Sequence, residues 1–468
     1  MAEPLRTMVR TRRQAVQAGC LSLLGLTSAQ MARIRIAQAA NASVPKARSC
    51  VFVFLFGGPS HIDLWDMKPK APAEIRGEFT PIATATPGMD LCEHLPLLAR
   101  ETDKLCLLRS MTHRMPVHGP ACSEMYSGRP YFGPPVTDQA TPQDWPSIAA
   151  LVQRFGAVRP GLPHSVVLPW YTQFVGQDKR IAGQTGGRMG EQFNPFVVQG
   201  DPTAERFGVD GLALAQPGYG GERLTARKRL RAQLDGVRPR EIEGNRSQLM
   251  GQQYGEAFGM LEAGRAADAF HLEGESPALR DRYGRTKFGQ SLLAARRLVE
   301  AGVSLVTVNW DDDSRFDKVS PHWDTHHLNF SKLKENLAPP FDRAFSAFLA
   351  DLANRGLLDD TLVVVTGEFG RTPKIGVVTQ NGMTEKTGRD HWPHAFTVLL
   401  AGGGVRGGQV YGATTSTGGY VADLPVTPAD LSATILTHLG INPHLEYDDE
   451  FQQMRQALSE GRVIEGLS

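Results

Sequence analysis

The stretch that decides the fold is Cys50–Phe56, CVFVFLF, which runs directly into Gly57–Asp63, GGPSHID. An unbroken apolar run of this length indicates a strand buried on both faces, as in a parallel sheet. The glycine-rich turn that follows carries Ser60, His61 and Asp63. A hydroxyl, an imidazole and a carboxylate at the carboxyl end of a buried strand are typical of a ligand site.

Further apolar runs of the same kind alternate with amphipathic stretches along the chain. The runs that read as buried parallel strands are Leu105–Leu108, Ser165–Leu168, Ser304–Val308, Leu362–Thr366 and Phe396–Ala401. Helical periodicity marks Lys287–Ala301, Phe341–Arg355 and Pro428–Leu439. Strands alternating with helices predict an α/β fold, a doubly wound and mostly parallel sheet with helices on both faces.

Composition places the chain among globular proteins and excludes one class of partner. It has 468 residues, 41% of them hydrophobic, and its 50 Lys and Arg balance 49 Asp and Glu. Because a formal charge of +1 provides no basic field for phosphate backbones, we expect no nucleic-acid partner. The sequence does not predict an oligomeric state.

Residues 1–39 have the features of an export signal. Arginines, among them the pair Arg12–Arg13, precede the apolar stretch Ala15–Ala29, and Ala37–Ala39 offers a small-x-small cleavage pattern. The arginine pair resembles the twin-arginine type. The apolar stretch is shorter than the roughly 20 residues that span a bilayer, so we expect a cleaved or anchored signal and a periplasmic or secreted protein without a transmembrane segment in the mature chain.

The rest of the chain, residues 40–468, is expected to form a single domain. From about Tyr171 to Glu275 the sequence is rich in Gly, Arg and Gln and lacks strong apolar runs, which predicts an irregular insertion, either over the site or as a purely structural loop. Four cysteines lie outside the signal, so one or two disulfides are compatible with an exported protein. They are Cys50, Cys92, Cys106 and Cys122.

Three further loops carry acids and imidazoles beside predicted strands. The loop after Ser304–Val308 leads to Asp324 and His326, which are two residues apart and can reach one divalent ion. Leu362–Thr366 ends in GEFGRTP, with Glu368 and Arg371, and Arg389, Asp390 and His391 stand just before Phe396–Ala401. An arginine in such a loop suits a bidentate contact with a tetrahedral oxyanion.

Each loop by itself also fits a common structural role. A lone acid after a strand is usually a helix cap or an ion-pair partner, and paired histidines are often surface groups. Strand ends of one doubly wound sheet, however, gather at the same edge. We therefore predict that these loops converge on a divalent metal site.

Long strings in the chain resemble a known family almost from end to end. The family is domain of unknown function 1501, a sulfatase-like group of the alkaline phosphatase and sulfatase superfamily, whose members also carry a twin-arginine signal. The resemblance rests on FLFGGPSHIDLWDMKP, HGPACSEMYSGRP, RDRYGRTKFGQSLLAARRLVEAGVSLVTVNW, WDTHHLNF, RGLLDDTLVVVTGEFGRTPK, GRDHWPHAFTVLLAGGGVRGGQVYG and TPADLSATILTHLGI.

The superfamily implies a metal-dependent ester hydrolase with one or two divalent ions, zinc, calcium or manganese. By this resemblance the metal ligands are Asp63, Asp324, His326, Glu368 and His391. Where relatives read Asp-His-Gly, this chain has Glu368-Phe369-Gly370, so one histidine of a second metal is absent. Either His61 or Asp390 replaces it, or one ion binds.

The nucleophile also departs from the superfamily pattern. Counting ten residues back from Gly128, where a sulfatase has its Cys or Ser, leads to His118, and Cys122 lacks the Pro and Arg that mark formylglycine conversion. Three interpretations of His118 stay open: it attacks as nucleophile, it acts as acid or base for the attacking water, or it ligates metal while Ser60 or Thr112 attacks. His113 is a candidate for the same tasks.

These features lead to one functional hypothesis and one rival. The hypothesis is metal-assisted hydrolysis of a sulfate or phosphate ester, either a small anionic ester or a sulfated glycan, with Arg371 or Arg389 holding the oxyanion. The rival is a non-catalytic exported binding protein that retains the fold. A phosphomutase or other transferase on the same fold is a third hypothesis.

Overall fold

The computed structural model describes the chain from residue 44 onward, with internal gaps. The described residues are 44–133, 140–157, 159, 161–174, 180–198, 200–204, 207, 225–230, 233, 265–317, 320–379, 387–449 and 451–468. The predicted export signal, residues 1–39, lies outside them. In the described part, no helix is both long enough and apolar enough to cross a membrane.

The centre of the fold is an eight-stranded sheet in the order β12-β4-β11-β8-β1-β7-β5-β6. Its strands are β1 (Ser49–Phe54), β4 (Leu105–Met111), β5 (Ser165–Leu168), β6 (Phe196–Val197), β7 (Leu305–Asn309), β8 (Thr361–Thr366), β11 (Phe396–Ala401) and β12 (Gln409–Tyr411). The first predicted strand is the middle of the sheet, because β1 pairs in parallel with β7 on one side and with β8 on the other. All six predicted strands are present.

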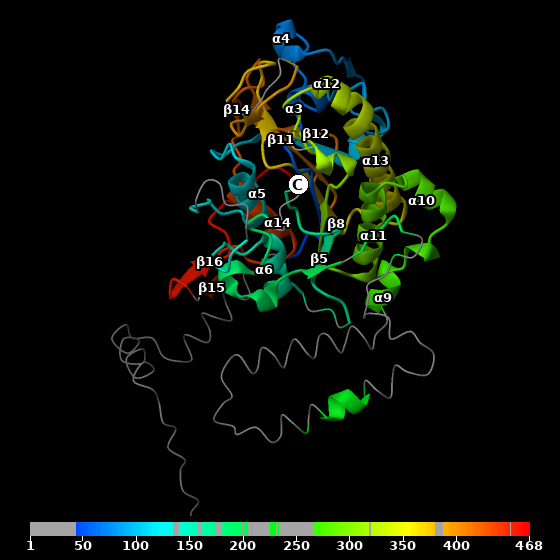
Figure 1. Ribbon diagram of the computed structural model, residues 1–468, viewed down its shortest axis with the longest axis vertical. Helices are drawn as coiled ribbons and strands as arrows, with labels where there is room; N and C mark the ends of the chain where they lie inside the picture. Colours follow the sequence, from blue (N-terminus) through cyan, green and yellow to red (C-terminus); the bar gives the residue numbers. More distant parts are fainter. Residues whose placement is uncertain are drawn as a thin grey trace, which may run out of the picture. The chain divides into compact units, whose positions relative to one another are not determined.

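Helices cover both faces of this sheet, as predicted (Figure 1). Val51, Val53 and Leu55 point into a core shared with α11 (Lys287–Ala301) and α13 (Ala338–Asn354). The alternate residues of β1 point into a second core, which α5 (His118–Ser127), α6 (Ile148–Phe155) and α14 (Pro428–His438) complete. The fully apolar β1 run therefore reflects burial on both faces.

The predicted helices begin and end at residues whose chemistry explains the boundaries. In α11 the Thr286 hydroxyl accepts a hydrogen bond from the amide of Gly289, and Gly302 closes the helix with φ of 112°. Thr427 and Asp430 form a capping box at the start of α14. Helix α13 begins three residues before the predicted Phe341, because prolines are tolerated in a first turn.

The predicted direction of one strand in the sheet is wrong. Strand β11 was expected to be parallel, but it is antiparallel to both of its neighbours, β4 and β8. A continuous apolar run reports burial on both faces and says nothing about direction, so the sequence pattern could not reveal this. The reversal brings the residues that precede β11 to the edge where the other strands end.

The remaining described segments are short elements and connections. Within the predicted insertion the described residues include three 3₁₀ turns (Gly187–Met189, Glu191–Phe193 and Leu272–Gly274), β6, a helical stretch at 225–230 and α9 (Arg265–Phe270). Short described helices outside the insertion include α3 (His61–Leu64), α4 (Ala73–Arg76), α10 (Pro277–Tyr283) and α12 (Asn329–Lys332). Cys50, Cys92, Cys106 and Cys122 are all buried, and no disulfide joins any of them to another.

Candidate metal centre

Four loops bring chemistry-bearing side chains to one edge of the sheet. The chain leaves β4 and enters α5 at His118, leaves β7 toward the loop of Asp324 and His326, and leaves β8 directly into Glu368. His391 arrives from the opposite direction, at the start of the segment that leads into β11. Their convergence is the geometry that a doubly wound sheet imposes on its strand ends.

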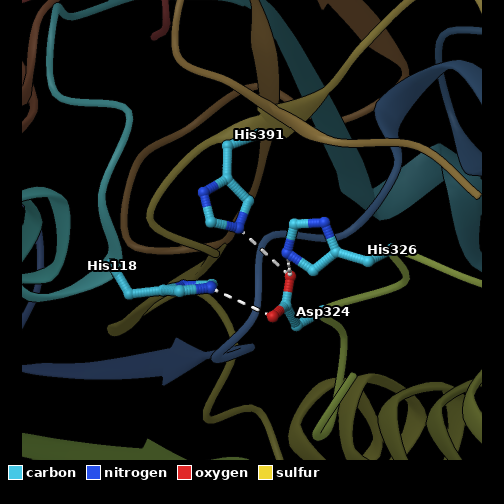
Figure 2. A group of neighbouring side chains, drawn as sticks. All are labelled: His118, Asp324, His326 and His391. Carbon is cyan, nitrogen blue, oxygen red and sulfur yellow. Dashed lines mark hydrogen bonds and ion pairs between the residues drawn. The ribbon is translucent and has the colours of Figure 1, made fainter. Parts of the chain in front are cut away.

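Four of these side chains form one compact and buried group (Figure 2). One candidate ligand atom from each of His118, Asp324, His326 and His391 lies within 4.8 Å of all the others. Asp324 is at the centre: its carboxylate oxygens lie 3.2 Å from His118 Nε2, 2.9 Å from His326 Nε2 and 3.2 Å from His391 Nε2. Three imidazoles and one carboxylate in this arrangement are a donor set for a divalent metal ion.

The far nitrogen of each histidine faces an acceptor. His118 Nδ1 lies 2.5 Å from Glu368 Oε1, and His391 Nδ1 donates to the carbonyl oxygen of Pro116 at 2.7 Å. His326 Nδ1 lies 3.3 Å from Asp390 Oδ1, without the geometry of a hydrogen bond. Metal-ligating histidines characteristically present one nitrogen to the metal and the other to a carboxylate or carbonyl.

His391 provides the clearest test of whether a cation fits. Because the Pro116 carbonyl can only accept, the ring proton is on Nδ1, and burial together with the positive charge of His118 lowers the pKa of His391 to about 3. Nε2 therefore presents a lone pair to Asp324 Oδ1, 3.2 Å away. Two acceptors that face each other in a buried site are stabilised by a cation between them. The residues fit a divalent metal ion.

The charges around Asp324 maintain its ionised form. Burial by itself would raise its pKa, but Arg371 and His118 hold the pKa of Asp324 well below its usual range. Burial would likewise lower the pKa of His118, but the carboxylates of Asp324 and Glu368 raise it to about 9. The carboxylate of Asp324 at the centre of the group is thus both buried and ionised.

Arg371 contacts the group through Asp324. One of its terminal nitrogens donates to Asp324 Oδ1 at 2.5 Å, and its Nε donates to the carbonyl of Gly58 at 2.9 Å. The other terminal nitrogen donates to the carbonyl of Arg389. Each of the three guanidinium nitrogens donates a hydrogen bond within the protein, so Arg371 is fixed in place and orients Asp324.

Asp63 and Arg389, a predicted ligand and a predicted oxyanion contact, are placed together and outside the group of four. Arg389 Nε and a terminal nitrogen each donate to an oxygen of Asp63 at 2.8 Å, and both side chains are fully buried. Asp63 also accepts from Ser60 Oγ and Asn329 Nδ2. The carboxylate of Asp63, the guanidinium of Arg389 and the hydroxyl of Ser60 are therefore bonded to one another, and these are the groups that a metal ion or a substrate would contact.

Two other predicted histidines are also outside the group. His113 Nε2 donates to the backbone carbonyl of Glu368, its Nδ1 accepts from the amide of Met115, and burial lowers its pKa to about 4. His61 Nε2 donates to the carbonyl of Gly418 at 2.8 Å, and its Nδ1 is buried without a partner. Burial lowers the pKa of His61 as well. The backbone contacts of both rings are those of neutral structural histidines.

Glu368 and Asp390 lie at the border of the group and do not belong to the four. Glu368 is fully buried, and its two oxygens accept from the amide of Gly57 at 3.0 and 3.2 Å. Asp390 accepts from the amides of Thr379 and His391. Both were predicted as metal ligands from the sequence. The contacts of the Pro116 carbonyl and the Gly57 amide could not be predicted, because backbone groups leave no mark in the residue types.

Aromatic side chains form a wall beside His118. Its ring centroid lies 5.3 Å from that of Phe56, 5.9 Å from that of Phe174 and 5.1 Å from that of Phe369. Phe369 also packs on His391 at 4.4 Å. This wall lowers the local polarity, which strengthens the electrostatic interactions inside the site.

Fold and site together define an α/β protein with a buried group of three histidines and one aspartate, able to hold a metal ion, at the carboxyl edge of its sheet. The chain belongs to the family described as protein of unknown function DUF1501, whose model matches residues 47–468. The family resemblance drawn from the sequence strings is thereby confirmed. No curated protein matches the chain.

Solved structures with a similar arrangement are distant in sequence. They include the PsFucS1 sulfatase from Pseudoalteromonas sp. (13% identity, 93% of this chain and 76% of that one, TM-score 0.37). The phosphonate monoester hydrolase SpPMH from Silicibacter pomeroyi is 13% identical over 89% of this chain and 75% of that one, with a TM-score of 0.37. Alkaline phosphatase from the Antarctic bacterium TAB5 is 12% identical over 85% and 99%, with a TM-score of 0.36.

Proposed function

We propose that the protein is a metal-dependent hydrolase of sulfate or phosphate esters, acting in the periplasm or outside the cell on a small anionic ester or a sulfated glycan. The observation that carries this proposal is the group of His118, Asp324, His326 and His391, whose candidate ligand atoms lie within 4.8 Å of one another. Three of these residues have a second contact that orients the ring or carboxylate.

In the proposed site His118, Asp324, His326 and His391 would hold the ion. When bound, a divalent cation such as zinc, calcium or manganese would polarise the ester and stabilise the negative charge that develops during hydrolysis. Arg371 fixes the carboxylate of Asp324, and the Pro116 carbonyl fixes the ring of His391. The rings of Phe56, Phe174 and Phe369 keep bulk water from His118 on the side that they cover.

The proposal assigns His118 to the ligand group, the third of the three roles left open by the sequence. Its Nε2 faces Asp324 and its Nδ1 faces Glu368, so both ring nitrogens already face a carboxylate. Ser60 donates to Asp63 and is fully buried, so of the two hydroxyls only Thr112 stays a candidate, and the proposal takes water as the attacking group.

The test measures bound metal and ester turnover in the same preparations. We expect the purified protein to hold about one divalent ion per chain by elemental analysis, as a single four-donor group would, and to release product from aryl sulfate or aryl phosphate esters. His391→Ala should lose both properties. His438→Ala is the matched control, because His438 is a buried histidine outside the group that donates to the carbonyl of Gly403. Equal metal content in wild type and His391→Ala would refute the ligand assignment.

A second candidate function is a non-catalytic exported binding protein that uses the same ion for structure or recognition. Two observations favour it: four protein donors are the number found in closed structural zinc sites, and both buried arginines are engaged by carboxylates and carbonyls. Wild-type protein that holds metal but turns over neither ester would support this function over the hydrolase.

A further inference from the structure

We infer that Glu368 is a positioning residue for His118 and not a ligand to the metal. This inference rests on the proposed metal centre and deepens it, because it assigns a separate task to the acid that follows β8. The argument starts from where the two oxygens of Glu368 lie and which groups they already contact.

Glu368 reaches the centre only through His118. Oε1 lies 2.5 Å from His118 Nδ1, on the opposite side of the ring from Nε2, the atom that faces Asp324. The group of four whose ligand atoms lie within 4.8 Å of one another does not include Glu368. An imidazole ring therefore stands between this carboxylate and the proposed ion.

The carboxylate itself is held in place by the backbone of another loop. Both of its oxygens accept from the amide of Gly57, at 3.0 and 3.2 Å, and the side chain is fully buried. Gly57 lies in the turn three residues after the end of β1, so the contact ties this turn to the turn after β8. A buried acid that is fixed in this way makes a rigid acceptor for the His118 ring.

The consequence for His118 is a defined tautomer and a defined ring plane. Glu368 Oε1 accepts from Nδ1, so in a metal-bound ring the proton stays on Nδ1, and Nε2, which faces Asp324, is the nitrogen that would ligate the ion. Carboxylates placed in this way also raise the basicity of the ligating nitrogen, and removing such a partner typically weakens metal binding by about 10- to 100-fold.

The experiment titrates Co²⁺, whose visible absorption reports the number and geometry of ligands, into metal-free wild type, Glu368→Gln and Glu124→Gln. The glutamine keeps the size of the side chain and one acceptor oxygen. Glu124→Gln is the matched control, since Glu124 is a buried acid on α5 whose Oε1 accepts from the amide of Tyr131. Thermal unfolding of the metal-free proteins shows whether each variant is folded.

We expect Glu368→Gln to bind Co²⁺ about 10- to 100-fold more weakly with an unchanged absorption spectrum, and Glu124→Gln to match wild type in both. A spectrum that changes in shape and intensity in Glu368→Gln would show that a ligand was lost and would overturn the inference, as would an unchanged affinity. If wild type binds no Co²⁺, the metal centre fails and the inference fails with it. If wild type binds Co²⁺ without ester turnover, only the hydrolase proposal fails.

Discussion

The contact between Asp63 and Arg389 is the residue-scale observation that most changes the expectation from the superfamily. Asp63 was expected to be the first-strand metal ligand, but the structure pairs it through two hydrogen bonds with Arg389. The pair is fully buried, so loss of one partner leaves an uncompensated charge. Its role can therefore be separated from metal binding by experiment.

We predict that Asp63→Asn destabilises the protein by about 3 kcal/mol while the metal content of the folded fraction stays at the wild-type value. The reason is that the Arg389 guanidinium loses its counter-charge, while the group around Asp324 is not touched. Urea unfolding measures the first quantity and elemental analysis the second. If Asp63→Asn were as stable as wild type but held no metal, Asp63 would be a metal ligand after all.

The buried histidine His113 should make the stability of the protein depend on pH. In the folded protein burial lowers its pKa to about 4, whereas an unfolded histidine titrates near 6.5. Between these values the unfolded chain binds more protons, so the contribution of His113 to stability is present above about pH 6.5 and is lost as the pH falls toward about 4.

We expect the free energy of unfolding of wild type to fall between pH 7 and pH 5 by about 2 kcal/mol more than that of His113→Gln. The other titrating groups are common to both proteins and cancel in this difference. His444→Gln, at an exposed position, should behave as wild type. Parallel pH profiles for wild type and His113→Gln would show that His113 is not held neutral by the fold.

At the scale of elements, the sequence predicted the layers well and the direction of one strand badly. Apolar runs and helical periods depend on burial, and burial is what the β1, β7 and β8 sequences encode. Whether β11 runs parallel or antiparallel depends on how its connection returns to the sheet, which no local pattern records. The prediction that His391 reaches the strand-end edge was confirmed, but the antiparallel direction of β11 is its cause.

The site shows the same division. Asp324, His326 and His391 were among the predicted ligands because acids and imidazoles beside strand ends are visible in the sequence, whereas His118 was named as a catalytic candidate from the superfamily spacing. Which acids ligate and which pair with arginine depends on side-chain directions within the loops. Asp63 and Glu368 have the same chemistry as Asp324, and only the fold separates the three.

Gly57 determines how closely two loops approach each other. It has φ of +112°, and a Cβ at this position would lie 2.3 Å from the amide nitrogen of Asp324. Gly57→Ala should therefore push the turn after β1 away from the Asp324 loop and weaken metal binding as well as stability. Gly88→Ala separates the two effects, because Gly88 also has a positive φ, of +83°, but no atom lies within 4 Å of a Cβ there.

We expect both glycine variants to lose stability, since L-residues disfavour positive φ by roughly 1 kcal/mol. Only Gly57→Ala should also lose affinity for Co²⁺ in a titration. Equal affinity in Gly57→Ala and Gly88→Ala would mean that the approach of the two loops does not determine the geometry of the centre.

At the scale of the whole molecule, the proposed ion joins segments from distant parts of the chain. His118, Asp324 and His391 come from the connections around β4, β7 and β11, so an ion bound by all of them contacts three separate parts of the sheet edge. Binding to the folded state alone stabilises it, by about 2.7 kcal/mol at a free metal concentration 100 times the dissociation constant. An unfolded chain does not bring these residues together.

We therefore predict that chelation lowers the thermal unfolding midpoint of wild type and that restored zinc raises it again, with the size of the shift growing with metal concentration. For a domain of this size the effect of about 2.7 kcal/mol corresponds to a few degrees. His391→Ala should show no shift, because it lacks one of the donors, while His438→Ala should shift as wild type does. A zinc-dependent shift of equal size in His391→Ala would place the stabilising ion elsewhere in the molecule and would separate it from the group around Asp324.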